Sequence, residues 1–87
     1  MRQPNVLVYG SHTCPDTVRA TEQLDSQNIP YEFKSVDDCP EYNDYIAGLN
    51  NGKRVMPTIQ VNNDVLINPS DDVLIAAVEK AAADVEP

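Results

Sequence analysis

The sequence Val-Leu-Val-Tyr-Gly-Ser-His-Thr-Cys-Pro at residues 6–15 combines a strand, a loop and the start of a helix. Its first four residues are apolar or β-prone, which predicts a short buried strand. Gly10 and Ser11 are expected to break that strand. Cys14 and Pro15 then open a helix, because proline suits the first turn, where its missing N–H would have had no partner. The stretch therefore predicts a cysteine at a helix N-terminus.

The middle of the chain continues with a strand and a second helix. The first helix is expected to end near Asn28, because Pro30 disfavours helical backbone just before it. Residues 31–36 alternate apolar and polar side chains, which predicts a second strand. Residues 37–40 form a loop, and the apolar spacing that follows predicts a helix ending at residues 50–52.

The last third of the sequence predicts a hairpin and a final helix. Residues 57–61 and 65–67 are strand-like, and the polar residues 62–64 between them predict a hairpin turn. Ser70 is a favourable N-cap, followed by two aspartates that suit the positive end of the helix dipole. Residues 82–87 are expected to fray.

The element order is therefore β-α-β-α-β-β-α, an α/β arrangement. One four-stranded mixed sheet covered by three helices fits this order and a length of 87 residues. No linker or repeat divides the chain, so we expect a single domain over residues 1–87.

Charge and composition restrict the partners. The formal net charge is −8, from 14 acidic and 6 basic residues. Nucleic-acid binding needs a clustered basic face, and docking on anionic lipid needs basic residues too, so neither partner is expected. No apolar run is long enough for a signal peptide or membrane span. We therefore expect a cytoplasmic monomer, whose two cysteines are reactive or inert thiols rather than a structural bridge.

Cys14 is the candidate nucleophile. A helix N-terminus offers unpaired N–H groups and a partial positive charge, which stabilise the thiolate and lower the pKa of the thiol. Thr17 lies one turn further on, where its hydroxyl can face the sulfur, whereas the carboxylate of Asp16 opposes a second negative charge. The alternative is a buried, inert cysteine at a helix start.

Three segments in the same order carry a family resemblance. Residues 8–15, residues 55–58 (Val-Met-Pro-Thr) and residues 68–72 (Asn-Pro-Ser-Asp-Asp) resemble the active-site entry, the Thr-Val-Pro segment and the glutamyl-binding segment of glutaredoxins. Residues 54–57 and 68–70 are especially similar to the mycoredoxin branch. The resemblance implies a thioredoxin-like fold and a thiol-disulfide oxidoreductase that serves electron transport and cell redox homeostasis.

The resemblance also implies roles for individual residues. Pro57 would be cis, and the backbone of Val55 and Met56 would bind an extended small thiol. Ser70 and Asp71 would bind the α-carboxylate and the α-amino group of this small thiol. Arg54 would bind its remaining carboxylate. Alternatively, Pro57 is an ordinary trans residue, Ser70 and Asp71 only cap the helix, and Arg54 is a solvated charge.

The sequence departs from the family pattern at two places. Thr17 stands where two-cysteine glutaredoxins have their second cysteine, which makes Cys14-Pro15-Asp16-Thr17 a monothiol version of the site. Ser11 stands where many relatives have a lysine that assists the thiolate and the ligand carboxylate. His12 could substitute in part as a hydrogen-bond donor near the small thiol, or it could be a surface residue.

Cys39 is placed at the end of the second strand, which should lie beside the first. Both strand ends would then meet near Cys14, so Cys39 is a possible resolving thiol, provided that the two Cα atoms approach within about 7 Å. The alternative is a bystander thiol. One histidine and two cysteines lack the spacing of a zinc site, so no metal ligand is predicted.

The leading function is an oxidoreductase acting on mixed disulfides between proteins and a small thiol. Its cosubstrate would be glutathione or another low-molecular-weight thiol, with no tightly bound cofactor. The alternatives on the same fold are an iron–sulfur cluster carrier and a redox-silent binding module.

Overall fold

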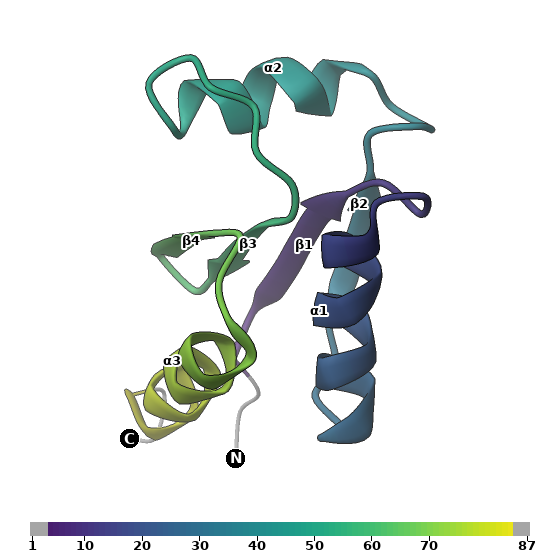
Figure 1. Cartoon of the computed structure of the whole chain (residues 1–87). Coiled ribbons are helices and arrows are strands. Elements are labelled where there is room, and N and C mark those ends of the chain that lie inside the picture. Colours follow the sequence, from purple (N-terminus) through teal and green to yellow (C-terminus); the bar gives the residue numbers. More distant parts are fainter. Residues whose placement is uncertain (1–3, 85–87) are drawn as a thin grey trace.

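Within residues 4–84, four strands form one mixed sheet in the order β2-β1-β3-β4, and three helices cover it (Figure 1). The computed structural model describes residues 4–84. The strands and helices, in chain order, are β1 (Val6–Gly10), α1 (Pro15–Ser26), β2 (Glu32–Ser35), α2 (Glu41–Gly48), β3 (Thr58–Val61), β4 (Asp64–Ile67) and α3 (Asp71–Asp84). The predicted order β-α-β-α-β-β-α is confirmed.

Strand pairing brings three loops to one edge of the sheet. β1 runs parallel to β2, with Gly10 opposite Ser35, and antiparallel to β3, with Tyr9 opposite Thr58. The carboxyl ends of β1 and β2 therefore meet the amino end of β3. The loops that carry Cys14, Cys39 and Met56 all begin or end at this edge.

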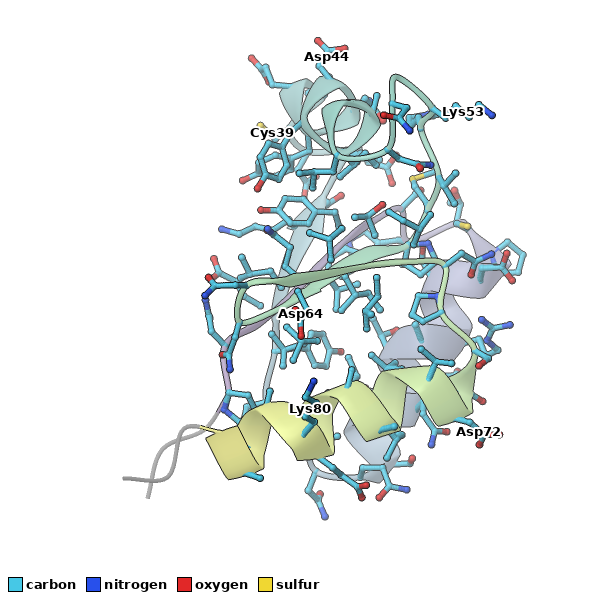
Figure 2. All side chains as sticks on the ribbon, turned by 90° about the vertical axis from the view of Figure 1, so that its left-hand side faces the viewer. Cys39, Asp44, Lys53, Asp64, Asp72 and Lys80 are labelled. Atoms are coloured by element: carbon cyan, nitrogen blue, oxygen red, sulfur yellow. The ribbon has the colours of Figure 1, made fainter. Side chains whose placement is uncertain are left out.

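Alternation along the strands gives the sheet two apolar faces. Val6 and Val8 point to one face and join a core built from β3, α1 and α3. Tyr9 points to the other face and packs with Val36 and with Ile46 of α2. Figure 2 shows the result, with α2 on one side of the sheet and α3 on the other.

Some predicted boundaries were wrong. Gly10 does not break the first strand: it pairs with Ser35 as the last residue of β1. Residues 82–84 do not fray, because α3 continues through alanines with high helix propensity beyond buried Ala81. The rest of the predicted frayed tail, residues 85–87, and residues 1–3 at the other end lie outside the described residues. α1 ends at Ser26, close to the predicted end, and Asn28 follows with φ 57°.

Candidate thiol site

Cys14 is the N-cap residue of α1, as its sequence position predicted. Its backbone is extended (φ −85°, ψ 118°), and its N–H donates to the Ser11 carbonyl at 3.1 Å. The half-buried sulfur lies 4.0 Å from the carbonyl oxygen of Met56. The Met56–Pro57 peptide bond is cis, in agreement with the expectation. The backbone at the cis bond therefore borders the thiol.

The local backbone lowers the pKa of the Cys14 thiol. The largest cause is the Thr17 N–H, which stabilises the thiolate by hydrogen bonding; partial burial opposes it, and the Thr17 hydroxyl and the Asp16 N–H lower the pKa further. The Asp16 carboxylate raises the pKa by charge repulsion, but this is the smallest of the causes. The helix N-terminus therefore outweighs the acidic neighbour.

Thr17 is buried beneath the thiol. It is 1% exposed, and its Oγ1 has no hydrogen-bond partner among residues 4–84. A buried hydroxyl without a partner is free to donate to a charge that develops next to it, and a Cys14 thiolate is such a charge. The structure thus places Thr17 where the sequence analysis expected it.

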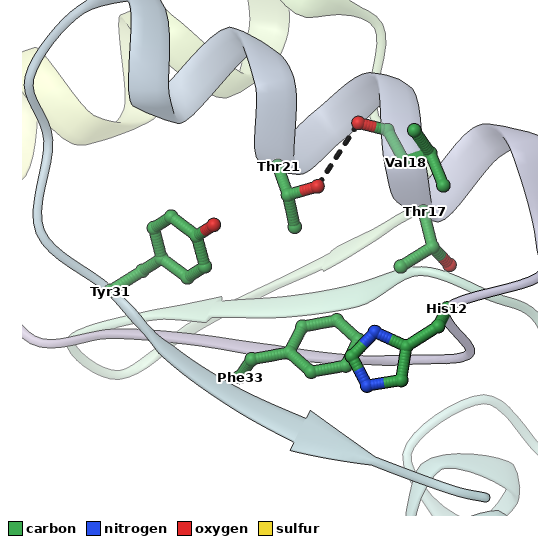
Figure 3. Close-up of a pocket in the computed structure, with 6 residues that line it drawn as sticks. All are labelled: His12, Thr17, Val18, Thr21, Tyr31 and Phe33. Atoms are coloured by element: carbon green, nitrogen blue, oxygen red, sulfur yellow. Dashed lines mark hydrogen bonds between the residues drawn. The ribbon is translucent and has the colours of Figure 1, made fainter.

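Ser11 contacts the loop after β2, and His12 contacts strand β2 itself. Ser11 is 5% exposed, and its hydroxyl donates to Asp37 at 2.8 Å, joining the loop after β1 to the loop after β2. The exposed His12 ring lies 4.6 Å from the Phe33 ring at a tilt of 40°. The two rings line one end of a hollow between α1 and β2, where Thr17 and Tyr31 also contribute (Figure 3).

Cys39 lies four residues beyond β2, not at the strand end as the sequence analysis placed it. The chain turns there, and the Cys39 N–H donates to the Ser35 carbonyl just before α2 begins. Its thiol donates to Glu41 Oε1 at 3.3 Å, and this contact with a carboxylate raises the pKa of Cys39. Cys14 and Cys39 are both free thiols.

Arg54 and Val55 lie in the segment between α2 and β3. The Arg54 guanidinium is exposed and donates to Asn43 Oδ1 of α2 at 2.8 Å. The Val55 carbonyl accepts from the Thr58 hydroxyl at 2.8 Å, which holds the turn around the cis bond. Arg54 is therefore anchored to α2 while its charge remains in solvent.

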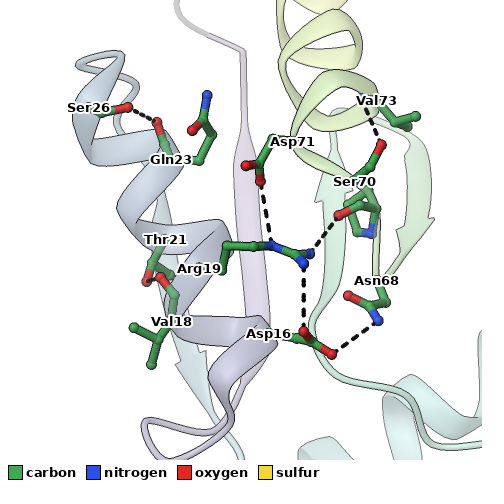
Figure 4. Close-up of polar contacts among 11 residues, drawn as sticks. Asp16, Val18, Arg19, Thr21, Gln23, Ser26, Asn68, Ser70, Asp71 and Val73 are labelled. Atoms are coloured by element: carbon green, nitrogen blue, oxygen red, sulfur yellow. Dashed lines mark hydrogen bonds and ion pairs between the residues drawn. The ribbon is translucent and has the colours of Figure 1, made fainter.

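The segment 68–71 joins β4 to α3 and faces the first turns of α1 (Figure 4). Ser70 is the N-cap of α3 as predicted, because its Oγ accepts from the Val73 N–H at 3.4 Å. Asp71 is paired with Arg19 at 3.6 Å, and Asn68 donates to Asp16 at 3.3 Å. The sequence analysis did not single out Arg19, and its helical position alone offered no signal that it would contact α3.

Comparison with known proteins agrees with this arrangement. A family model described as Glutaredoxin matches residues 6–66. The chain belongs to the glutaredoxin family. It is also 29% identical to mycoredoxin 1 of Corynebacterium glutamicum, over 90% of this chain and 98% of that protein. This membership supports a redox protein that acts as a thiol oxidoreductase.

Solved structures show that this glutaredoxin-family chain has the thioredoxin fold. A glutaredoxin from Archaeoglobus fulgidus superposes with a TM-score of 0.76 at 19% identity, covering 86% of each chain. A buckwheat glutaredoxin–glutathione complex gives a TM-score of 0.71 at 14% identity, covering 92% of this chain and 81% of that one. Within residues 4–84, no helix is long and apolar enough to cross a membrane.

Proposed function

We propose that this glutaredoxin-family protein reduces mixed disulfides between proteins and a low-molecular-weight thiol, with Cys14 as its single nucleophile. One observation carries the proposal: the Cys14 thiol sits at the N-terminus of α1, where the Thr17 N–H and hydroxyl lower its pKa. The thiolate is the species that attacks disulfides. A lower pKa of the Cys14 thiol therefore raises the fraction of Cys14 that is thiolate near neutral pH.

The reaction takes two exchanges. In the first, the Cys14 thiolate attacks the small-thiol sulfur of the mixed disulfide, a bond forms between them, and the substrate protein leaves as a thiolate. In the second, the thiolate of another small-thiol molecule attacks the sulfur bound to Cys14. Cys14 leaves as a thiolate, and the two small thiols depart as their disulfide. The net change is a disulfide exchange: the protein sulfur is released as a thiol, and the sulfur of the incoming small thiol is oxidised to the disulfide level in its place.

The second exchange needs a thiol from solution, because Thr17 occupies the place of a second active-site cysteine. In the proposal, the Val55–Met56 backbone binds the small thiol in an extended conformation, as a strand edge would. Ser70, Asp71 and Arg54 hold its charged ends. The glutathione bound in the buckwheat relative supports a peptide-like cosubstrate.

The setting proposed for this reaction is a reducing cytoplasm, with the protein acting as a monomeric domain over residues 1–87. The two free thiols support a reducing compartment. The acidic surface favours basic regions of protein substrates, through complementary charge.

A direct test measures release of the small thiol from a peptide–glutathione mixed disulfide, with a peptide–mycothiol disulfide in parallel. We expect turnover by the parent and by Cys39→Ser, and none by Cys14→Ser, because only Cys14 is the nucleophile. Turnover by Cys14→Ser, or its loss in Cys39→Ser, would contradict a single-nucleophile mechanism. A brown protein after anaerobic reconstitution with iron, sulfide and the small thiol, without turnover, would instead identify an iron–sulfur carrier.

A further inference from the structure

Arg19 connects the helix that carries Cys14 to the segment that precedes α3. Its guanidinium lies 3.7 Å from the Asp16 carboxylate and 3.6 Å from that of Asp71, and it donates to the Pro69 carbonyl at 3.3 Å (Figure 4). These partners come from two elements about 50 residues apart in sequence. One cation therefore serves two carboxylates and a backbone carbonyl at the same point.

The Asp16 carboxylate is the group whose position matters for the thiol. It lies two residues after Cys14 and opposes the thiolate by charge repulsion. Arg19 approaches one of its oxygens, and the Asn68 side-chain amide donates to the other at 3.3 Å. Arg19 lies one turn further along α1, and its guanidinium reaches Pro69 and Asp71, while Asn68 belongs to the 68–71 segment itself, so both Asp16 oxygens are engaged on the side that faces this segment.

We propose that Arg19 is a positioning residue for the thiol site, which acts on Cys14 by holding the Asp16 carboxylate toward the 68–71 segment. Without Arg19, the Asp16 side chain is released from one of its two contacts. It then samples rotamers closer to the sulfur, and the thiolate becomes less favourable. Arg19 thus limits the loss of Cys14 reactivity that the nearby Asp16 carboxylate would otherwise cause.

The other charged groups described around this site do not hold the Asp16 carboxylate in place of Arg19. Asp71 of α3 lies on the far side of the Arg19 guanidinium, where it shares that cation. Asp37 accepts a hydrogen bond from the Ser11 hydroxyl, and the His12 ring packs against the Phe33 ring at a tilt of 40°. Arg19 is therefore the described cation that pairs with Asp16.

The inference rests on the proposed function only for the role of Cys14 as nucleophile. The pH dependence of Cys14 alkylation by iodoacetamide reads the pKa of the thiol whether or not the protein turns over a disulfide. All variants are made in a Cys39→Ser background, so that a single thiol is followed. Loss of disulfide turnover with a normal alkylation profile would count against the proposed function and leave this inference standing.

The decisive comparison is a double-mutant cycle of Arg19→Gln and Asp16→Asn. We expect Arg19→Gln to raise the Cys14 midpoint by a few tenths of a pH unit, and Asp16→Asn to lower it by a similar amount. In the Asp16→Asn background, Arg19→Gln should have much less effect, because the carboxylate that Arg19 positions is gone. Arg19→Lys should restore part of the parent value.

Two results would overturn the inference. If Arg19→Gln shifts the Cys14 midpoint equally in the parent and in the Asp16→Asn background, Arg19 acts on the thiolate directly. If the midpoint does not shift in either background, Arg19 does not act on the thiol at all. Lys80→Gln is the matched control, since it removes one exposed positive charge from α3 and should leave the midpoint unchanged. Thermal unfolding of each variant verifies the fold, and Arg19→Lys keeps the test informative if Arg19→Gln is destabilised.

Discussion

Gly10 of β1 and Thr17 of α1 are in such close contact that a Cβ atom on Gly10 would lie 2.5 Å from Thr17 Oγ1 and 2.7 Å from its Cγ2. Thr17 is 1% exposed and β-branched, so it has little freedom to move aside. The glycine thus lets the first turn of the helix approach the end of the strand. The same contact keeps the Thr17 hydroxyl under the Cys14 thiol.

Gly10→Ala should destabilise the fold and weaken the thiol site. We expect the free energy of unfolding to fall by about 1–3 kcal/mol, the usual effect of overpacking a tight interior. The Cys14 pKa should rise as well, because displaced Thr17 no longer stabilises the thiolate. Urea unfolding and the pH dependence of alkylation measure the two effects.

Gly48→Ala is the control for this prediction. A Cβ at Gly48 meets no atom within 4 Å, and the residue lies in α2. Alanine is favoured over glycine in helices by up to about 1 kcal/mol, so this variant should be neutral or stabilised. Equal destabilisation of both variants would show that the Gly10–Thr17 contact is not responsible.

Thr17→Val should raise the Cys14 pKa while leaving the fold intact. Valine keeps the shape of threonine but has no hydroxyl to donate to the thiolate. The backbone N–H of residue 17, the larger cause of the lowered pKa, remains, so the midpoint should stay below that of an ordinary cysteine. Thr17→Ser, which keeps the hydroxyl, should stay near the parent value. A Thr17→Val midpoint equal to the parent's would exclude a role for the hydroxyl.

The two cysteines should react in a fixed order. The pKa of Cys14 is lowered and that of Cys39 is raised, so at any pH below about 8.5 the Cys14 thiolate is the more populated. Brief iodoacetamide treatment at pH 7, followed by peptide mass spectrometry, should find Cys14 labelled first. Glu41→Gln should lower the Cys39 pKa and narrow the difference, because the carboxylate beside that thiol is removed. Faster labelling of Cys39 in the parent would contradict both pKa directions.

Substitutions at Ser70 can separate capping from ligand binding. Ser70→Ala removes the cap of α3 and should lower the free energy of unfolding by about 1 kcal/mol. Ser70→Asp keeps a good cap but adds a negative charge where the small thiol's carboxylate is proposed to bind. It should therefore retain stability while raising KM for a glutathione mixed disulfide. An unchanged KM would argue against carboxylate binding at Ser70.

Cys39 as a resolving thiol is the alternative to the single-nucleophile mechanism proposed for Cys14. If it resolves a mixed disulfide on Cys14, mild oxidation of the parent should give an intramolecular disulfide that Cys39→Ser cannot form. Non-reducing peptide mapping detects the bond. Its absence from the oxidised parent would leave Cys39 a bystander held by Glu41.

Local sequence was sufficient for the features that depend on neighbouring residues. The alternation and helical spacing of apolar residues predicted all seven elements. The Cys14-Pro15 pair predicted a helix N-terminus with a favoured thiolate, and Ser70 was predicted as a cap. Each of these depends on contacts within about one turn of helix or along one strand, which the order of residues largely determines.

Tertiary structure alone decided the contacts between distant segments. Gly10 looked like a strand breaker, but its function is to admit Thr17, which only the packing of α1 on β1 reveals. Arg19 meets Pro69 and Asp71 because α1 and α3 cover the same face of the sheet. Such contacts depend on how whole elements are arranged in space, and no local pattern of side chains encodes that arrangement.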